Sequence, residues 1–539
     1  MLVVEDKKKL VLHTALSDEI LTFIPHARKF EHEGQNLTAV PHGVEESLVL
    51  RNMGFKKIPP PILSYYDWPA RFSPMEHQKK TAAFATMNKR ATVLNAPGTG
   101  KSIAVLWAAD YLIREGLAKR VLIVAPLSTV KLVWGMEIRH HLPHRSFELL
   151  TGTKEARLRK LSVPGTQFFI VNHDGFNVIK EHLPAIDVVI YDEATALKTP
   201  GSQRFRQFYT WVQVHNPWLW MLTGTPISQS PVDAWTLARL VGNPDVPKSF
   251  TTFKDRVMTK VSTFRWVPRP EALDICQRVL QPSIRFSLED CTEIPDTLYL
   301  AHQCPMSKEQ LKTFKEMKEQ AVLLAHDVSA PNMAVAMQKL IQICCGVVYG
   351  TNGSRIKLDF TERYDVLTDV MAEIGVLGSI TRGAKNQLGG KVARDDTPGE
   401  KVIVFVPLRG VQDRLYELLV AGGYDVDCVH GDIVGKKRDK IFHTFQNTNE
   451  IKILLAHPKV AAHGLTLTAA KDIIWYAPIY SLEQYEQANA RIRRISTDGK
   501  TRVHHLWGTA FEKELYSRLQ NKRRVLADFL EMIQGGNED

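Results

Sequence analysis

Short apolar runs separated by amphipathic stretches recur along most of this chain. Within residues 71–245, the runs that predict buried strands are 91–94, 121–125, 168–172, 188–191 and 219–223. Helical patterns lie between them, for example over 101–115, ahead of Gly116, and near 130–141. Strands that are apolar throughout and alternate with helices predict an α/β fold whose parallel sheet is covered on both faces. Ligand sites in such sheets lie at the carboxyl ends of the strands.

The same alternation returns in the C-terminal part of the chain, after a stretch that lacks it. Residues 246–395 look mainly helical, as over 308–325 and 332–344, and the glycine-rich, charged segment 378–400 predicts an exposed loop. Beyond it the predicted strands are 402–406, 425–430, 452–456 and 472–476. The predicted helices are 411–420, 437–445, 482–493 and 511–533. The pattern therefore predicts two parallel-sheet lobes with a helical insertion between them.

The first 70 residues differ from both series. Two apolar runs, 2–4 and 10–12, flank a charged turn and predict a hairpin, and 44–53 predicts a helix that Gly54 ends. The proline run 59–61 favours a linker. The expected domains are a small N-terminal α+β accessory domain (1–70), lobe 1 (71–245), the helical linker region (246–395) and lobe 2 (396–539). Two roles stay open for the accessory domain: binding DNA or a partner, and bracing lobe 1.

Composition narrows the class of protein. The chain has 539 residues, which is too long for one core. No apolar run reaches the length of about 18 residues that a membrane span needs, and the charged N-terminus does not resemble a signal peptide, so we expect a cytoplasmic protein without a membrane partner. The six cysteines form no C-x-x-C pair, which disfavours zinc and disulfides. A net charge of +11 favours a polyanionic partner, although many basic proteins bind no nucleic acid.

Residues 95–102, read N-A-P-G-T-G-K-S, carry the strongest candidate chemistry, because a predicted strand precedes them and a predicted helix follows. In such a loop the backbone N–H groups turn toward phosphate oxygens. The residues expected to surround the phosphates of ATP are Pro97, Gly98, Thr99, Gly100, Lys101 and Ser102. Lys101 would reach the outer phosphates, and Ser102 would hold Mg²⁺. Asn95 stands where this motif usually has its first glycine, so a plain glycine-rich turn is the alternative.

A phosphate-binding loop needs an acidic partner at the end of a neighbouring strand, and V-V-I-Y-D-E-A-T at 188–195 supplies one. Asp192 would coordinate Mg²⁺, and Glu193 would orient or deprotonate the attacking water. The alternative is an acidic pair that starts a solvated helix. Because the pair follows an apolar strand at the edge where ligands bind, we favour the catalytic interpretation.

These and other segments resemble the motifs of Swi/Snf-type superfamily 2 helicases. D-E-A-T at 192–195 is similar to motif II, L-T-G-T-P at 222–226 to motif III, and V-L-I-V-A-P-L-S-T-V-K-L-V-W at 121–134 to motif Ia. In lobe 2, segments 401–405, 463–468 and 487–495 resemble motifs IV, V and VI. The matches follow the family's order, and the wording of motif V is most similar to compact bacteriophage members.

The resemblance implies that both lobes are RecA-like and that the chain is a P-loop NTPase. It also implies that Gln78 reads adenine and that Gln487, Arg491 and Arg494 belong to the ATP site. A helix over 482–493 would put Arg491 and Arg494 near one face, where both could stabilise the charge of phosphoryl transfer. A plain basic surface cluster is the alternative.

By position in the family's motifs, nine residues are expected to contact nucleic acid. They are Pro126, Ser128, Asn172, Thr223, Thr225, His430, Gly431, Gly464 and Thr466. Each is also open to a capping or turn role. Contacts from such residues to phosphates carry no sequence information.

We therefore expect a monomeric, Mg²⁺- and ATP-dependent DNA translocase or helicase. Its substrate would be duplex, single-stranded or branched DNA, its partners replication or recombination proteins, and its location the host cytoplasm if a phage encodes it. The alternative is a nucleic-acid-binding clamp that uses ATP as a switch. The departures from the family pattern at Asn95, Thr195 and Thr466 could support that alternative. A metabolite kinase fits poorly, because it has no use for a second lobe.

Overall fold

The computed structural model describes residues 1–32, 34–69, 73–262, 266–291, 297–327, 330–349, 354–376, 400–433, 435–461, 467–492 and 501–535. The chain divides into two compact units, Met1–Cys291 with Asp528–Asp539, and Thr292–Ala527. The loop predicted over 378–400 lies, apart from Glu400, outside the described residues. No helix in the described part of the chain is both long enough and apolar enough to cross a membrane.

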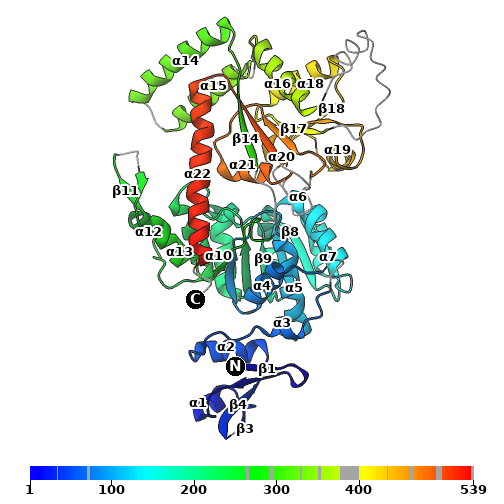
Figure 1. The fold of residues 1–539 in the computed structure, drawn as a ribbon, viewed down its shortest axis with the longest axis vertical. Helices are drawn as coiled ribbons and strands as arrows, with labels where there is room; N and C mark the ends of the chain where they lie inside the picture. The colour runs from blue at the N-terminus through cyan, green and yellow to red at the C-terminus, as the bar shows by residue number, and fades with distance from the viewer. Residues whose placement is uncertain are drawn as a thin grey trace. The chain divides into compact units, whose positions relative to one another are not determined.

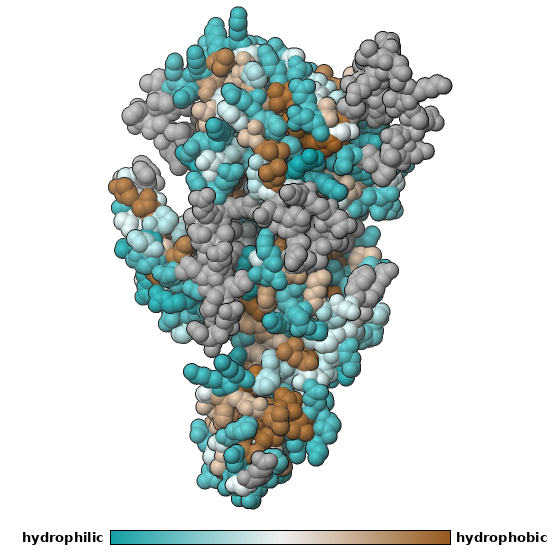
Figure 2. Space-filling model, in the orientation of Figure 1, coloured by the Kyte–Doolittle hydropathy of each residue, from teal (hydrophilic) through white to brown (hydrophobic). Residues whose placement is uncertain are grey.

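The first unit begins with a four-stranded antiparallel sheet. Its strands, in spatial order, are β1 (Leu2–Val4), β2 (Lys9–Leu12), β4 (Gln35–Pro41) and β3 (Arg28–His32). The predicted hairpin and helix are confirmed as the β1–β2 pair and α2 (Val44–Asn52). Figure 2 shows mostly hydrophilic side chains on the visible face, with apolar side chains grouped over this N-terminal part.

His42 helps to attach this small sheet to the chain that follows. Its Nε2 lies 2.8 Å from the carbonyl oxygen of Pro59 and donates to it, and its Nδ1 accepts from the Tyr65 hydroxyl at 2.9 Å. Burial lowers the pKa of His42, which favours the neutral ring that this arrangement requires. Ile62 and Tyr66, just beyond, are buried in the core of the larger sheet.

That larger sheet is seven-stranded and parallel at every pairing. In spatial order its strands are β13 (Ser283–Ile284), β5 (Arg90–Val93), β10 (Trp218–Leu222), β9 (Val188–Tyr191), β6 (Val121–Ala125), β8 (Phe168–Asn172) and β7 (Phe147–Leu150). The five predicted strands are confirmed within a residue at their ends. The two edge strands were missed, because β7 is only half-buried and β13 is two residues long.

Helices cover both faces of this sheet (Figure 1). They include α4 (Glu76–Thr86), α5 (Lys101–Arg114), α7 (Met136–His141), α9 (His173–Ile179), α10 (Gln203–His215) and α11 (Ala234–Val241). Ile123 and Ile190 pack in one buried cluster with Trp107 of α5. Tyr191 points to the opposite face, where its ring lies 4.7 Å from that of Phe208 in α10. Burial on both faces explains why the strands read as continuous apolar runs.

The second unit contains a six-stranded parallel sheet. Its strands, in spatial order, are β14 (Leu298–Gln303), β21 (Arg502–Trp507), β20 (Asp472–Trp475), β17 (Val402–Phe405), β19 (Ile453–Ala456) and β18 (Val426–Val429). Its helices include α14 (Lys308–Asp327), α15 (Ala330–Cys344), α16 (Thr361–Ile374), α18 (Arg409–Ala421), α19 (Gly435–Asn447), α21 (Leu482–Asn489) and α22 (Ala510–Gly535). The expectation of a mainly helical segment 246–395 was incomplete, because the segment also contributes strands. Strand β13 pairs with β5 in the sheet of the first unit, and β14 pairs with β21 in the sheet of the second unit.

A buried ion pair lies at the centre of the second unit. Arg363 Nη2 of α16 lies 2.8 Å from Glu512 Oε1 of α22, and the two side chains are 2% and 0% exposed. The guanidinium also donates to the carbonyl oxygens of Cys344, Tyr476 and Leu506. The pair therefore joins α15, α16, α22, strand β21 and the residue that follows β20 through buried groups.

Buried His505 of β21 makes the stability of this unit depend on pH. Its Nε2 lies 2.7 Å from the Tyr485 hydroxyl, and its ring stacks on Tyr516 at 4.2 Å. Burial, reinforced by the nearby His504 and His302, lowers the pKa of His505 to about 3. In the unfolded chain the pKa is about 6.5. The unfolded state therefore binds the extra proton between these values, so the contribution of His505 to stability is complete above about pH 6.5 and is lost as the pH falls toward 3.

Between pH 6.5 and 3, His505 is expected to lower the free energy of unfolding by about 1.4 kcal/mol for each pH unit of acidification. His505→Phe keeps an aromatic ring against Tyr516 but cannot titrate, so its loss of stability from pH 7 to pH 5 should be smaller. Urea unfolding of both proteins across this range measures the difference. Equal slopes in wild type and variant would show that His505 is not the titrating group.

Candidate nucleotide-binding site

Three loops meet at one edge of the first unit, where strands β5, β10 and β9 end side by side. Segment 95–102 follows β5, segment 223–225 follows β10, and Asp192 and Glu193 follow β9. A Cβ added to Gly224 would lie 3.1 Å from the Cδ of Pro97, so the first two loops approach each other closely. The structure thus brings the predicted phosphate loop and the predicted acidic pair to the same edge.

The phosphate loop has the backbone that its glycines permit. Gly98 and Gly100 have φ angles of +90° and +79°, which residues with a Cβ rarely adopt. A Cβ on Gly100 would also clash with the Gln78 amide. Helix α5 begins at Lys101, so the amides of its first turn have no intrahelical partner and face the loop. This arrangement suits a phosphate group.

Gln78 and His77 hold the loop from α4. The Nε2 of His77 donates to the carbonyl oxygen of Thr99 at 2.7 Å, and the Nε2 of Gln78 donates to the same oxygen at 3.2 Å. The Oε1 of Gln78 accepts from the Met75 amide at 3.1 Å. The structure therefore places Gln78 beside the phosphate loop, whereas its contact with adenine stays a prediction. Sequence reasoning missed His77, although it directly precedes Gln78.

Asn95, the departure from the usual motif, is a buried brace. It is 1% exposed, its Nδ2 donates to Thr81 Oγ1 at 2.9 Å, and its Oδ1 accepts from the Phe286 amide at 3.1 Å. Asn95 is not among the residues with positive φ, so its position does not require glycine. Arg285 adds a bond to the carbonyl oxygen of Leu94, and burial lowers the pKa of this arginine to about 10, which leaves it charged at neutral pH.

Asn95→Ala is expected to lower the free energy of unfolding by about 1–3 kcal/mol, because it leaves the partly buried Phe286 amide without its acceptor and removes the donor to Thr81 Oγ1. Urea unfolding of the full chain measures this loss. Gln213→Ala, at an exposed position of α10, is the matched control and should be close to neutral. Equal stabilities for the two variants would contradict the bracing role of Asn95.

The acidic pair is held in a fixed conformation. Asp192 is 6% exposed, its Oδ2 accepts from Trp134 Nε1 at 2.9 Å, and its Oδ1 accepts from the Glu193 amide at 3.0 Å. Glu193 has a φ of +49°, a left-handed conformation that is uncommon for a residue with a side chain and is typical of functional sites.

These residues fit a Mg²⁺ ion that is shared with phosphates. Each carboxylate oxygen of Asp192 accepts one of the bonds above, which leaves a further lone pair on each for a cation or its water. Mg²⁺ is usually held by one or two carboxylates together with substrate phosphates. Within the described residues, no group of three or more His, Cys, Asp or Glu side chains could hold a metal by itself.

The predicted nucleic-acid residues of this unit lie at the ends of β6, β8 and β10. Pro126 is buried at the start of α6 (Leu127–Thr129), and Ser128 is half-buried beside it. Asn172 is buried, and its Oδ1 accepts from an arginine side chain at 3.1 Å. Thr223 and Thr225 are also buried, and the hydroxyl of Thr223 accepts from the amide of Thr225. In the structure the two threonines shape the turn after β10.

In the second unit, the helix predicted over 482–493 ends earlier. Helix α21 stops at Asn489, and Arg491 lies in the following turn, so the expectation that Arg491 sits on a helical face was wrong. The carbonyl oxygen of Arg491 accepts from the amide of Leu467, a bond outside the helix. Its Nε donates to the carbonyl oxygen of Gln487 at 3.0 Å, and both side chains are buried.

The remaining predicted residues belong to the second unit too. His430 is buried at the end of β18, and Gly431 next to it is exposed. Gly464, Thr466 and Arg494 lie outside the described residues.

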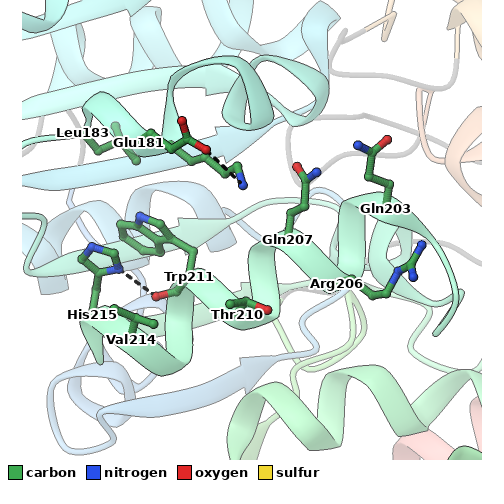
Figure 3. Close-up of a pocket in the computed structure, with 10 residues that line it drawn as sticks. Glu181, Leu183, Gln203, Arg206, Gln207, Thr210, Trp211, Val214 and His215 are labelled. Carbon is green, nitrogen blue, oxygen red and sulfur yellow. Dashed lines mark hydrogen bonds and ion pairs between the residues drawn. The ribbon is translucent and has the colours of Figure 1, made fainter.

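A separate pocket of about 730 Å³ lies along α10 of the first unit. Figure 3 shows Gln203, Gln207 and Trp211 on this helix, with Glu181 and Leu183 across the hollow. His215 closes one end, where its Nδ1 donates to the carbonyl oxygen of Trp211 at 2.9 Å. None of the predicted site residues lines this pocket.

A phosphate loop, an acidic pair two strands away and a second parallel α/β unit define a helicase-like P-loop protein. The model of the SNF2-related domain matches residues 77–346, half of the chain, and that of the helicase conserved C-terminal domain matches residues 385–496. The chain therefore belongs to the SNF2-related family.

Individual relatives are distant. Protein p41 of Acyrthosiphon pisum secondary endosymbiont phage 1 is 25% identical over 505 residues, which cover 85% of this chain and 98% of p41. Chromodomain-helicase-DNA-binding protein 1-like of Mus musculus is 24% identical over 456 residues, which cover 82% of this chain and 47% of that protein, so the chain spans less than half its length. The structure of the Sulfolobus solfataricus SWI2/SNF2 ATPase core in complex with dsDNA is 19% identical and covers 89% of this chain and 96% of that one, with a TM-score of 0.40.

Proposed function

We propose that this protein is a Mg²⁺- and ATP-dependent DNA translocase that moves along duplex or branched DNA in replication, recombination or repair. One observation carries the proposal. A chain of the SNF2-related family places a glycine-rich phosphate loop after β5 and an acidic pair with a left-handed Glu193 after β9, at the same edge of the sheet and on either side of β10. The net charge of +11 supports a polyanionic partner.

The phosphate loop and the acidic pair then each have a role in ATP hydrolysis. The loop amides and Lys101 would bind the phosphates, and Ser102 and Asp192 would hold Mg²⁺, which would supply positive charge against the phosphates. Glu193 positions the attacking water and accepts its proton. The backbone of Glu193 is held in its left-handed conformation by its own amide, which donates to the Asp192 carboxylate.

Arg491 and Arg494 are proposed to stabilise the charge that spreads over the γ-phosphate during transfer. Arginine suits this task because its planar guanidinium stays charged and donates several hydrogen bonds at once. Gln487, whose carbonyl oxygen holds the Nε of Arg491, would set the direction of that side chain.

The loops after β6 and β8, meaning the turn at Pro126 and Ser128 and the junction at Asn172 where α9 begins directly, are proposed to bind DNA phosphates. In the sheet order they lie on the far side of β9 from the phosphate loop, so one edge offers room for ATP and DNA together. Contacts of this kind are electrostatic and independent of sequence, and DNA affinity should fall steeply with added salt.

The direct test is the ATPase rate with single-stranded, duplex and forked DNA and with RNA, paired with two displacement assays. Removal of a third strand from a triplex reports movement along duplex, whereas release of a paired strand reports unwinding. Triplex displacement without unwinding supports the translocase. Retained ATP binding with turnover close to zero on every nucleic acid would instead support the clamp that uses ATP as a switch.

A further inference from the structure

Trp134 connects one predicted DNA-binding loop with the predicted metal ligand. The side chain is fully buried, and its Nε1 donates to Asp192 Oδ2 at 2.9 Å. An indole N–H can only donate, so this bond occupies one lone pair of the carboxylate and fixes the plane of the group. Trp134 and Asp192 lie on elements that follow β6 and β9, which are neighbours in the sheet.

The chain between the loop and Trp134 is a single continuous helical segment. It starts after Pro126 at the end of β6, runs through α6 and continues without a break as a π-helix, η2 (Val130–Gly135). Leu127 at its start is 66% exposed, whereas Trp134 at its far end reaches the interior. A π-helical turn holds an extra residue compared with an α-helix, and such turns are frequent at functional sites. The exposed Leu127 and the Asp192 carboxylate are thus connected by one continuous helical segment and one hydrogen bond.

A second connection starts from the neighbouring loop. His173 directly follows Asn172 at the end of β8, and its Nε2 donates to the carbonyl oxygen of Asp192 at 2.8 Å. Its ring is stacked on Tyr191, with centroids 5.0 Å apart and an interplanar angle of 8°. The segments that follow both predicted DNA-binding loops thus contact Asp192: Trp134 binds its carboxylate, and His173 binds its backbone carbonyl oxygen.

We propose that Trp134 and His173 are positioning residues that couple DNA contact at the loops after β6 and β8 to the placement of the Asp192 carboxylate. The inference rests on the proposed function. DNA phosphates that settle on these loops would set the carboxylate in the position that binds Mg²⁺ and ATP productively. Neither side chain touches the reacting atoms. Their effect is therefore on the affinity for the ion and on the gain in turnover that DNA produces.

The test compares wild type with Trp134→Phe, which keeps an aromatic ring at this position but removes the N–H donor. The Mg²⁺ concentration that gives half-maximal binding of a fluorescent ATP analogue should rise by about 10-fold or more, the usual cost of losing a partner behind a metal ligand. The stimulation of ATP turnover by duplex DNA should fall, while DNA affinity stays unchanged. High Mg²⁺ should restore binding of the analogue. His173→Phe should change the same two quantities in the same direction.

Trp107→Phe is the matched control, because Trp107 is also buried in this core and its Nε1 donates to the carbonyl oxygen of Pro69 instead. A loss that Trp107→Phe shares and that Mg²⁺ does not restore would mean general damage to the core, and it would overturn the proposal. Wild-type Mg²⁺ dependence and wild-type DNA stimulation in Trp134→Phe would overturn it as well, while leaving the proposed function intact. A wild-type protein whose turnover DNA does not stimulate would overturn the proposed function itself.

Discussion

Replacing Glu193 with glutamine is expected to lower ATP turnover by about 10²- to 10⁴-fold, the usual contribution of a general base. Glutamine has the same shape and the same backbone preference, but its amide cannot accept the proton of the attacking water. Binding of ATP should persist, because Lys101 and the loop amides hold the phosphates. Steady-state hydrolysis with saturating duplex DNA, together with equilibrium binding of a fluorescent ATP analogue, measures both quantities.

Glu181→Gln is the matched control for this substitution. Glu181 is an exposed glutamate of the same unit, and it lines the pocket along α10, away from the phosphate loop. Its replacement should leave turnover unchanged. If Glu193→Gln kept near-normal turnover, the catalytic assignment would be wrong, and the left-handed conformation of Glu193 would need another explanation.

Replacing Arg363 with methionine is expected to lower the free energy of unfolding by about 3–5 kcal/mol, because it leaves the carboxylate of Glu512 buried without its cation. The three carbonyl oxygens that the guanidinium binds would lose a donor at the same time. Hydrogen–deuterium exchange of α16 and α22 in the full chain reports this loss locally. Exchange in the sheet of the first unit serves as the internal reference.

The double variant Arg363→Met with Glu512→Leu distinguishes the cost of an unpaired buried charge from the cost of altered packing. Apolar replacement of both partners of a buried pair is often neutral or stabilising. The double variant should therefore exchange more slowly than Arg363→Met alone. Equal exchange rates in the two variants would show that the cost arises from packing and the unpaired carbonyl oxygens, with no contribution from an isolated charge.

The central strands and the loops at their ends could be predicted because their physical signals are local. A strand buried on both faces is apolar throughout, as in β6 and β9, and the phosphate loop needs glycine at positions of positive φ. Edge strands lack this signal. No residue of β14 is buried, so this strand lacks the signal of a core strand, and only its pairing with β21 identifies it.

The partners of the site could not be predicted, because they depend on contacts between distant segments. Asn95 reads as a defect in the glycine motif, and only the fold shows it bound to Thr81 and to the Phe286 amide. Trp134 reads as an ordinary core residue until the structure places its N–H on Asp192. Helix α21 likewise ends before Arg491, whose carbonyl oxygen accepts from the distant Leu467 amide, a contact that no helical pattern contains.

The measurement that tests the central claim most directly is steady-state ATP hydrolysis by the wild-type protein with and without duplex DNA, at low and at high salt. We predict turnover that requires Mg²⁺, rises several-fold with DNA, loses this gain as salt is added, and disappears in Lys101→Ala. Turnover that is the same with and without DNA, or that survives Lys101→Ala, would contradict the account.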